Sequence, residues 1–363
     1  MIRVLHIVTH MNRGGLETMI MNYYRQINKN VVQFDFLVHR KERADYDDEI
    51  ETLGGTIYRL SPLNPLSISY RMQLDSFFAK HREYKIVHCH LNCMSSLVLF
   101  YAQKNHIPVR IAHAHNTNQE KGIKFFIKSF YQKRIPSVST ELIACSEKAG
   151  LWMFRGKDFT TLNNAIDSKR FAFNLQYRRK IRDEFGINDE IVIGHIGRFD
   201  YQKNHDFLID IFQSINNLTD KKTVLLLVGN GDKESEVRTK VNRLGLSDRV
   251  IFTGVRSNVN ELIQAMDIFV FPSRFEGLPV TLVEVQTSGL QCIISDKVPE
   301  ETVITENLVS VKSLNESAEE WAIHILSRIG EPRYTRIDEV KAHGYDIEEA
   351  SKWLENYYLN KLK

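Results

Sequence analysis

Short apolar runs alternate with longer amphipathic stretches along almost the whole chain, and this alternation constrains the fold more than any other feature. Strands separated by helices form parallel sheets that are covered on both faces. We predict strands at residues 3–9, 34–39, 55–60, 86–90, 110–115, 142–145, 191–196, 223–228, 250–253, 268–271 and 292–295. The expected fold class is therefore α/β, with two Rossmann-like parallel-sheet domains.

The pattern restarts near residues 165–190, which divides the chain into two similar halves. A length of 363 residues also suits two domains of roughly 150 residues each. We expect an N-terminal domain over residues 1–170 and a second domain over 171–345. Residues 346–363 form a C-terminal helix that is expected to pack back toward the first domain, with its aromatic stripe facing the core.

Composition excludes several classes of protein. Lys and Arg number 48 against 45 Asp and Glu, a balance that argues against a nucleic-acid partner. The longest apolar stretches, such as 97–102, are far shorter than the ~20 residues that span a bilayer. Four cysteines show no paired framework, and the chain enters a strand with no signal peptide. We expect a reduced, cytoplasmic protein.

Ligands of such sheets bind beyond the carboxyl ends of the strands, so residues that follow strands carry the information. Gly14 and Gly15 follow the first strand and precede a helix. Paired glycines there suit a phosphate, and a plain tight turn is the alternative. The G-x-G-x-x-G spacing is absent, which disfavours a nicotinamide dehydrogenase.

The second half places cations and glycines at the same kind of position. Gly197 and Arg198 end one strand, Lys203 follows them, and Gly229 lies in a glycine-rich turn after the next. Arg and Lys at a strand end suit an anionic ligand. Solvated surface cations and a simple strand-to-helix turn remain the alternatives.

The segment 271–284 carries the strongest signal. A strand ends at Phe271, and Pro279 marks the first turn of a helix, because its missing N–H would be unpaired there. The following amides would then face a ligand with the positive end of the helix dipole. Glu276 and Glu284 beside such a site suit hydroxyl groups, as on a sugar and a ribose.

The G-R-x4-K arrangement of Arg198 and Lys203, together with Glu276-x7-Glu284, resembles family 4 of the retaining glycosyltransferases, found in bacterial capsular and exopolysaccharide synthesis. Residues 162–167 are similar to the family's N-G-[IV]-D segment, with Ala165 where glycine is usual. The resemblance implies a GT-B fold whose two domains face a central cleft. The first domain would take the acceptor and the second the nucleotide-sugar donor.

The resemblance also implies roles for the matched residues. Arg198 and Lys203 would neutralise the donor diphosphate, Glu276 would face the transferred sugar, and Glu284 the ribose. Val255 and Arg256 would lie near the base. The implied donor-binding residues are Gly14, Gly15, Gly197, Gly229, Val255, Arg256, Gly277, Leu278, Pro279, Val280 and Glu284.

Family members also carry a histidine after a strand on the acceptor side. Here the match falls on His113 or His115, and we favour His115 because it stands at the strand end. Alternation along a strand would point both side chains to one face. Each is also compatible with a purely structural role.

The predicted function is transfer of a sugar, with retention, from a nucleotide-sugar donor that we expect to be UDP-linked to a glycan or lipid-linked glycan. The family implies no metal and no cofactor, and the nucleotide sugar is a substrate. Two alternatives stay open: a sugar-nucleotide epimerase or hydrolase of the same fold, and a non-catalytic sugar-nucleotide binding subunit.

Two further segments invite interpretation. His88, Cys89, His90 and Cys93 resemble metal ligands, but no second cysteine pair completes a tetrahedral site, and we expect none. Residues Lys121–Arg134 are basic, without acids, and interleaved with aromatics. Such a segment suits the anionic inner face of the plasma membrane, which would make the protein peripheral there; a helix with its aromatic side buried is the alternative.

Overall fold

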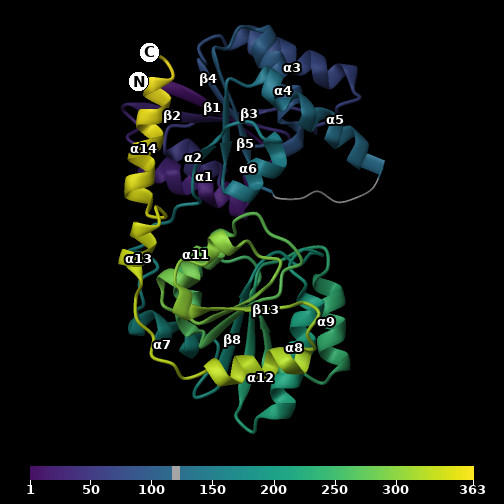
Figure 1. The fold of residues 1–363 in the computed structure, drawn as a ribbon, viewed down its shortest axis with the longest axis vertical. Helices are drawn as coiled ribbons and strands as arrows, with labels where there is room; N and C mark the ends of the chain where they lie inside the picture. Colours follow the sequence, from purple (N-terminus) through teal and green to yellow (C-terminus); the bar gives the residue numbers. More distant parts are fainter. Residues whose placement is uncertain (117–122) are drawn as a thin grey trace. The chain divides into compact units, whose positions relative to one another are not determined.

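The computed structural model of the protein describes residues 1–116 and 123–363 (Figure 1). The chain forms two compact units. The first contains Met1–Ala165 and Asp346–Lys363, and the second contains Ile166–Tyr345. The chain thus passes from one unit to the other between Ala165 and Ile166, where the sequence had suggested residues 170 and 171.

The first unit is built on a seven-stranded parallel sheet. Its strands are β1 (Ile2–Val8), β2 (Val32–Val38), β3 (Ile57–Arg59), β4 (Ile86–Cys89), β5 (Val109–Ala114), β6 (Glu141–Ala144) and β7 (Thr160–Thr161). Their order in the sheet is β3-β2-β1-β4-β5-β6-β7. The order reverses between β1 and β4, which is the point where ligands of open α/β sheets bind.

Helices cover both faces of this sheet. They are α1 (Gly15–Gln26), α2 (Asp47–Thr52), α3 (Ile68–Lys80), α4 (Ser95–Lys104), α5 (Ile123–Val138), α6 (Glu147–Phe154) and α14 (Ile347–Asn360). Figure 1 shows α14 beside α1, although the two lie at opposite ends of the chain. Leu354 and Tyr358 of α14 are buried, whereas Trp353 is 41% exposed. The prediction that the whole aromatic stripe faces the core is therefore wrong for Trp353.

The second unit repeats the plan with six parallel strands. They are β8 (Ile191–Ile196), β9 (Thr223–Val228), β10 (Val250–Phe252), β11 (Ile268–Phe271), β12 (Cys292–Ser295) and β13 (Val309–Lys312), in the order β10-β9-β8-β11-β12-β13. Its helices are α7 (Leu175–Glu184), α8 (His205–Leu218), α9 (Glu234–Arg243), α10 (Val259–Ala265), α11 (Val280–Thr287), α12 (Ala318–Arg328) and α13 (Ile337–Ala342). Here the order reverses between β8 and β11.

The predicted fold class, α/β with two Rossmann-like parallel-sheet domains, is confirmed. The central strands are near-continuous apolar runs because helices bury both faces of each sheet; β2 is buried along its whole length. β7 and β13 were not predicted, since β7 has two residues and β13 alternates Val with Ser and Lys at a sheet edge. Within the described residues, no helix combines the length and apolar character needed to cross a bilayer.

Candidate active site

An ion pair stands at the carboxyl ends of β8 and β11, where the strand order of the second unit reverses. Lys203 Nζ lies 2.6 Å from Glu276 Oε1, and Gln202 Nε2 donates to Glu276 Oε2 at 2.9 Å. Lys203 also lies over the ring of Phe271, 4.5 Å from its centroid. Glu276 is buried. The structure therefore joins two of the predicted catalytic residues in a partly desolvated pair.

Backbone contacts fix the two loops that carry this pair. The amide of Arg274 donates to Gln202 O at 2.8 Å, and Asn204 Nδ2 donates to Pro272 O at 3.1 Å. Asn204 has a left-handed backbone (φ 58°), a conformation that asparagine tolerates, and α8 begins directly after it. The loop after β8 is thus tied to the loop after β11 on both sides of Lys203.

Two glycines let neighbouring loops approach beside the pair. The Gly197 amide donates to Val228 O at 2.9 Å. Gly229 has a φ of +131°, and a Cβ on it would stand 2.2 Å from Gly197 O. Only glycine fits at 229. Arg198 follows Gly197 and is exposed, and none of the described residues pairs with its guanidinium.

Helix α11 begins at Val280, with Pro279 as its N-cap residue. Gly277, Leu278 and Val280 are buried beside it. Glu284 lies one turn further along and is also buried, and burial raises the pKa of its carboxyl to about 7, with Arg170 opposing the shift. Glu276 and Glu284 therefore differ in kind, because the first is ion-paired and the second holds its proton near neutral pH.

The loop after β10 approaches the same strand ends only in part. The Gly229 amide donates to Gly254 O at 2.9 Å, and Val255 beside it is exposed. Arg256 instead pairs with Glu184 at 2.8 Å and donates to Asn258 Oδ1. The structure thus holds the Arg256 guanidinium at the end of α7, so Val255 is the freer of the two predicted base contacts.

The glycine pair of the first unit begins a helix. Gly14 is the N-cap residue of α1, with an extended backbone, and Gly15 is its first residue. A Cβ on Gly15 would meet nothing within 4 Å. Neither glycine has a backbone that other residues avoid, so the strand-to-helix turn does not itself demand them.

The two candidate histidines differ sharply in their surroundings. The two rings lie on the same face of the strand, with their centroids 4.0 Å apart. His113, in β5, is buried and hydrogen-bonded to His88. His115 follows β5, is partly exposed, and contacts His90 at 2.9 Å through Nε2. Of the two, His115 is the one that a substrate can reach.

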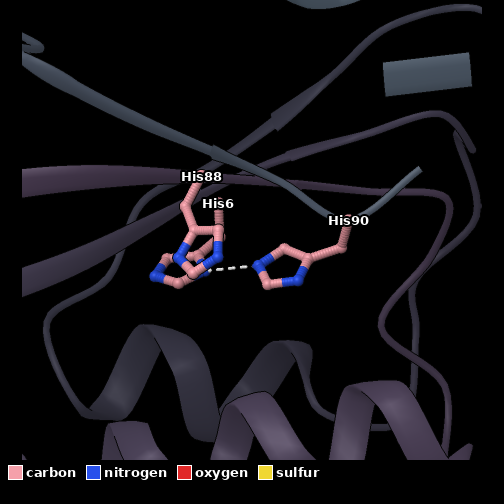
Figure 2. A group of neighbouring side chains, drawn as sticks. All are labelled: His6, His88 and His90. Atoms are coloured by element: carbon pink, nitrogen blue, oxygen red, sulfur yellow. Dashed lines mark hydrogen bonds between the residues drawn. The ribbon is translucent and has the colours of Figure 1, made fainter. Parts of the chain in front are cut away.

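Five histidines gather at the β1, β4 and β5 strand ends, and Figure 2 shows His6, His88 and His90 among them. Two groups of three bring one ring nitrogen per residue within 4.8 Å: His6 with His88 and His90, and His90 with His113 and His115. These groups contain neither a thiolate nor a carboxylate to offset an ion's charge. Cys89 and Cys93, considered above as ligands with His88 and His90, are buried, form no disulfide bond and lie outside both groups.

Two contacts were not predicted from the sequence: that of Gln202 with Glu276 and that of His6 with His90. Gln202, which holds Glu276, lies beside Lys203 but matches no motif. His6 lies on a buried strand, 84 residues from its hydrogen-bond partner His90. Nothing local in the sequence signals such a partner; only the register of β1 against β4, which sets His6 opposite His88, brings them together.

The basic segment Lys121–Arg134 is described only in part. Residues 117–122 and the side chains of 123 and 124 lie outside the described residues. In α5, Tyr131 is buried, whereas Phe126 and Phe130 are 78% and 50% exposed. The alternative in which the aromatic side is buried therefore does not hold for these two phenylalanines.

Comparison with known proteins gives matches over nearly all of the chain. Residues 13–170 match the family described as Glycosyltransferase Family 4, and residues 177–336 match Glycosyl transferases group 1. EpsF of Bacillus subtilis (strain 168) is 35% identical over 98% of this chain and 96% of its own. The capsular polysaccharide biosynthesis glycosyltransferase CapH of Staphylococcus aureus is 24% identical over 99% of both.

Solved structures agree on the fold. HepE of Anabaena, crystallised with UDP and glucose, has a TM-score of 0.77 at 15% identity and covers 98% of this chain and 95% of its own. Two Rossmann-like sheets, the strand-end ion pair and the two family matches thus lead to one assignment. The chain is a glycosyltransferase of the GT-B fold and belongs to family 4.

Proposed function

We propose that this glycosyltransferase moves a sugar, with retention, from a UDP-linked donor to a glycan or lipid-linked glycan in surface polysaccharide synthesis. The Lys203–Glu276 pair at the strand reversal of the second unit carries the proposal. Two relatives support its details: CapH is named for capsular polysaccharide biosynthesis, and HepE binds UDP and glucose.

The second unit offers the groups that such a reaction needs. The bond between the sugar's anomeric carbon and the diphosphate breaks, and a bond to the acceptor hydroxyl oxygen forms on the same face. The acceptor's proton passes to the leaving phosphate oxygen, so the step balances without a base from the protein. Negative charge grows on the diphosphate, which Arg198 and Lys203 would neutralise, while the amides at the start of α11 would hold its oxygens.

Glu276 has a separate task in this scheme. A carboxylate accepts hydrogen bonds from hydroxyl groups and repels phosphate. Its contact with Lys203 holds the Glu276 side chain in place while the donor is absent. In the complex Glu276 would accept hydrogen bonds from sugar hydroxyls, and the ammonium group of Lys203 would also interact with the phosphate.

A product assay with purified chain, UDP-sugars and a lipid-linked glycan tests the proposal. A thermal-shift screen against nucleotide sugars first identifies the donor. We expect Glu276→Gln and Lys203→Gln each to reduce transfer by about a hundredfold or more, the scale of losing one group that stabilises transition-state charge. Wild-type turnover in either folded variant contradicts the assignment.

Lys240→Gln is the matched control. Lys240 pairs with Asp206 and Asp210 of α8, and none of these three residues is among the proposed donor-binding residues. The activity of Lys240→Gln should stay within about twofold of the wild-type activity. UDP-sugar consumption that needs no acceptor would instead indicate a hydrolase or epimerase, and donor binding without any turnover a binding subunit.

We also propose that α5 places the protein on an anionic lipid surface. Phe126 and Phe130 stand one turn apart on the helix and are exposed. Lys128, Lys133 and Arg134 accompany them, and Arg134 lies over the Phe130 ring, 4.2 Å from its centroid. Exposed aromatic rings bordered by cations suit the boundary between lipid headgroups and acyl chains.

Flotation with vesicles of phosphatidylglycerol and phosphatidylcholine tests this surface. The triple variant Lys128→Glu, Lys133→Glu, Arg134→Glu should leave the vesicle fraction, because about 1 kcal/mol per basic residue near the lipid is lost. The control reverses three exposed cations of the second unit, Lys221, Lys222 and Arg243. Equal flotation of both variants would reject the α5 surface.

A further inference from the structure

Three histidines form a hydrogen-bonded chain across β1, β4 and β5. His6 Nδ1 lies 3.0 Å from His90 Nε2, the contact drawn in Figure 2. His90 Nδ1 lies 2.9 Å from His115 Nε2. His6 and His90 are buried, whereas His115 is partly exposed at the end of β5. We call these three residues the histidine chain.

The number of protons in the histidine chain is fixed. Burial lowers the pKa of His6 and of His115 to about 3 and lowers that of His90 well below its usual range. Each ring is therefore neutral at pH 7 and carries one N–H. Each of the two contacts needs one N–H, so all protons must point the same way along the histidine chain.

Only two arrangements satisfy this condition. In the first, His6 Nδ1–H donates to His90 and His90 Nδ1–H donates to His115 Nε2, which leaves the proton of His115 on Nδ1. In the second, every bond is reversed, and His115 Nε2–H donates inward. The two arrangements place opposite chemistry on the outer ring nitrogen of His115, Nδ1, which has no partner among the described residues: a donor in the first and an acceptor in the second.

The inner end of the histidine chain decides between them. His6 Nε2 is buried and has no hydrogen-bond partner among the described residues. The cavity beside it measures about 10 Å³, the lower limit for one water. Its lining includes histidines besides Met19, Ile20 and Leu354, but the surface that these residues expose to the cavity is apolar. The second arrangement would bury an N–H without a partner there, which is rarer than an unused acceptor. The first leaves only a lone pair.

We infer that His6 and His90 are positioning residues that hold His115 in the Nδ1–H tautomer, so that it offers a substrate oxygen a hydrogen-bond donor. The inference rests on the proposed function for the identity of that substrate. The inference also defines the role of His115. A neutral ring whose outer nitrogen already carries the proton has no lone pair there, so it cannot accept a proton from the substrate. His115 would then orient a hydroxyl or phosphate oxygen and would not act as the base.

Nitrogen NMR of the full chain labelled with ¹⁵N-histidine tests the tautomer directly, since protonated and bare ring nitrogens resonate far apart. At pH 7.5 we expect His6, His90 and His115 all to carry the proton on Nδ1. A His115 signal from Nε2–H, from an even mixture or from the charged ring overturns the inference. This readout needs no substrate, so it stands whether or not the proposed function is correct.

Two variants with the same branched arrangement of side-chain heavy atoms separate positioning from packing. Asparagine at 90 places an amide N–H near the position of Nδ1, whereas leucine cannot donate. His90→Asn should keep the His115 tautomer and most of kcat/KM, and His90→Leu should mix the tautomers and lower kcat/KM about tenfold, the value of one hydrogen bond. A purely structural role predicts the reverse order, because leucine suits a buried site better.

Tyr358→Phe is the control for disturbing the cluster. The Tyr358 hydroxyl contacts His88 Nδ1 at 2.7 Å, and His88 Nε2 contacts His113. This branch has no hydrogen bond to the histidine chain among the described residues. The variant should leave the His115 tautomer unchanged and kcat/KM within twofold; a tautomer change as large as that of His90→Leu would contradict the inference. Thermal unfolding of each variant verifies its fold.

Discussion

At the residue scale, the second unit keeps two buried carboxyl groups in different states. Lys203 and Gln202 satisfy the carboxylate of Glu276, whereas Glu284 has no ion pair among the described residues. Burial is the larger cause of the raised pKa of Glu284, and the charge of Arg170 offsets it in part. Burial of an unpaired carboxylate opposes folding, so stability alone does not explain a glutamate at position 284.

Glu284→Gln should stabilise the protein at alkaline pH. The pKa of Glu284 in the folded state, about 7, lies above its ordinary value of 4.5. The folded state therefore favours the protonated form, and stability is lost as the pH rises from 4.5 to 7. At pH 8 the free energy of unfolding should be roughly 2–3 kcal/mol higher for the variant than for the wild type, and at pH 4.5 the two values should be equal. Urea unfolding at both pH values measures this.

Glu276→Gln serves as the comparison at this scale. It removes the partner of Lys203, so no gain in stability at pH 8 is expected. An equal gain in stability at pH 8 in both variants would contradict the prediction, because the gain would then not arise from the burial of Glu284. If Glu284 also binds the ribose, Glu284→Gln should weaken UDP binding while it stabilises the free protein, the usual trade between stability and function.

At the element scale, α14 completes the first unit although it comes from the other end of the chain. Tyr358 packs edge-on against Phe34 of β2 and contacts His88 of β4. Tyr357 donates to Glu141 Oε2 at 3.0 Å. The helix therefore covers the central strands of a sheet whose own sequence ended some 180 residues earlier.

Two neighbouring residues of α14 should respond very differently to truncation. Leu354 is 2% exposed, and Leu354→Ala should lower the free energy of unfolding by about 2–4 kcal/mol through lost burial and a cavity. Trp353 is 41% exposed, and Trp353→Ala should lower it by less than about 1 kcal/mol. Urea titrations followed by circular dichroism compare them. Similar losses would mean that the packing face of α14 is wrongly assigned.

At the scale of the whole molecule, the two units differ in their response to acid. Burial lowers the pKa of six histidines in the first unit: His6, His39, His88, His90, His113 and His115. The unfolded state takes up these protons below pH 6.5 and the folded state does not, so stability is lost as pH falls from 6.5. Buried His195 and His205 give the second unit fewer such groups.

The first unit should therefore unfold first on acidification. Each neutral buried histidine lowers stability by about 1.4 kcal/mol per pH unit below 6.5, and the first unit holds six of them. Pulsed hydrogen exchange with mass spectrometry, in steps from pH 7 to pH 4, should show amides of β1, β4 and β5 exchanging before those of β8 and β11. Simultaneous exchange, or the second unit first, would contradict this order.

The sequence by itself determined most of the strands, the two-sheet plan and the position of Lys203 and Glu276 beyond strand ends, because each rests on local patterning or on the rule that parallel strands end at one edge. That Lys203 and Glu276 form an ion pair was found only in the structure. The sequence favoured His115 over His113 only by its place at the strand end, since alternation puts both side chains on one face of one strand. It missed β7 and β13, whose residues carry little apolar signal, and it placed Trp353 in the core.

Only the tertiary structure decided which side chains meet across strands. Register between β1 and β4 sets His6 near His90, and the return of α14 brings Tyr358 to His88. Contacts across 84 and 270 residues leave no periodicity in a sequence. They arise from the packing of whole elements, and the chemistry of a buried histidine follows from its neighbours in space.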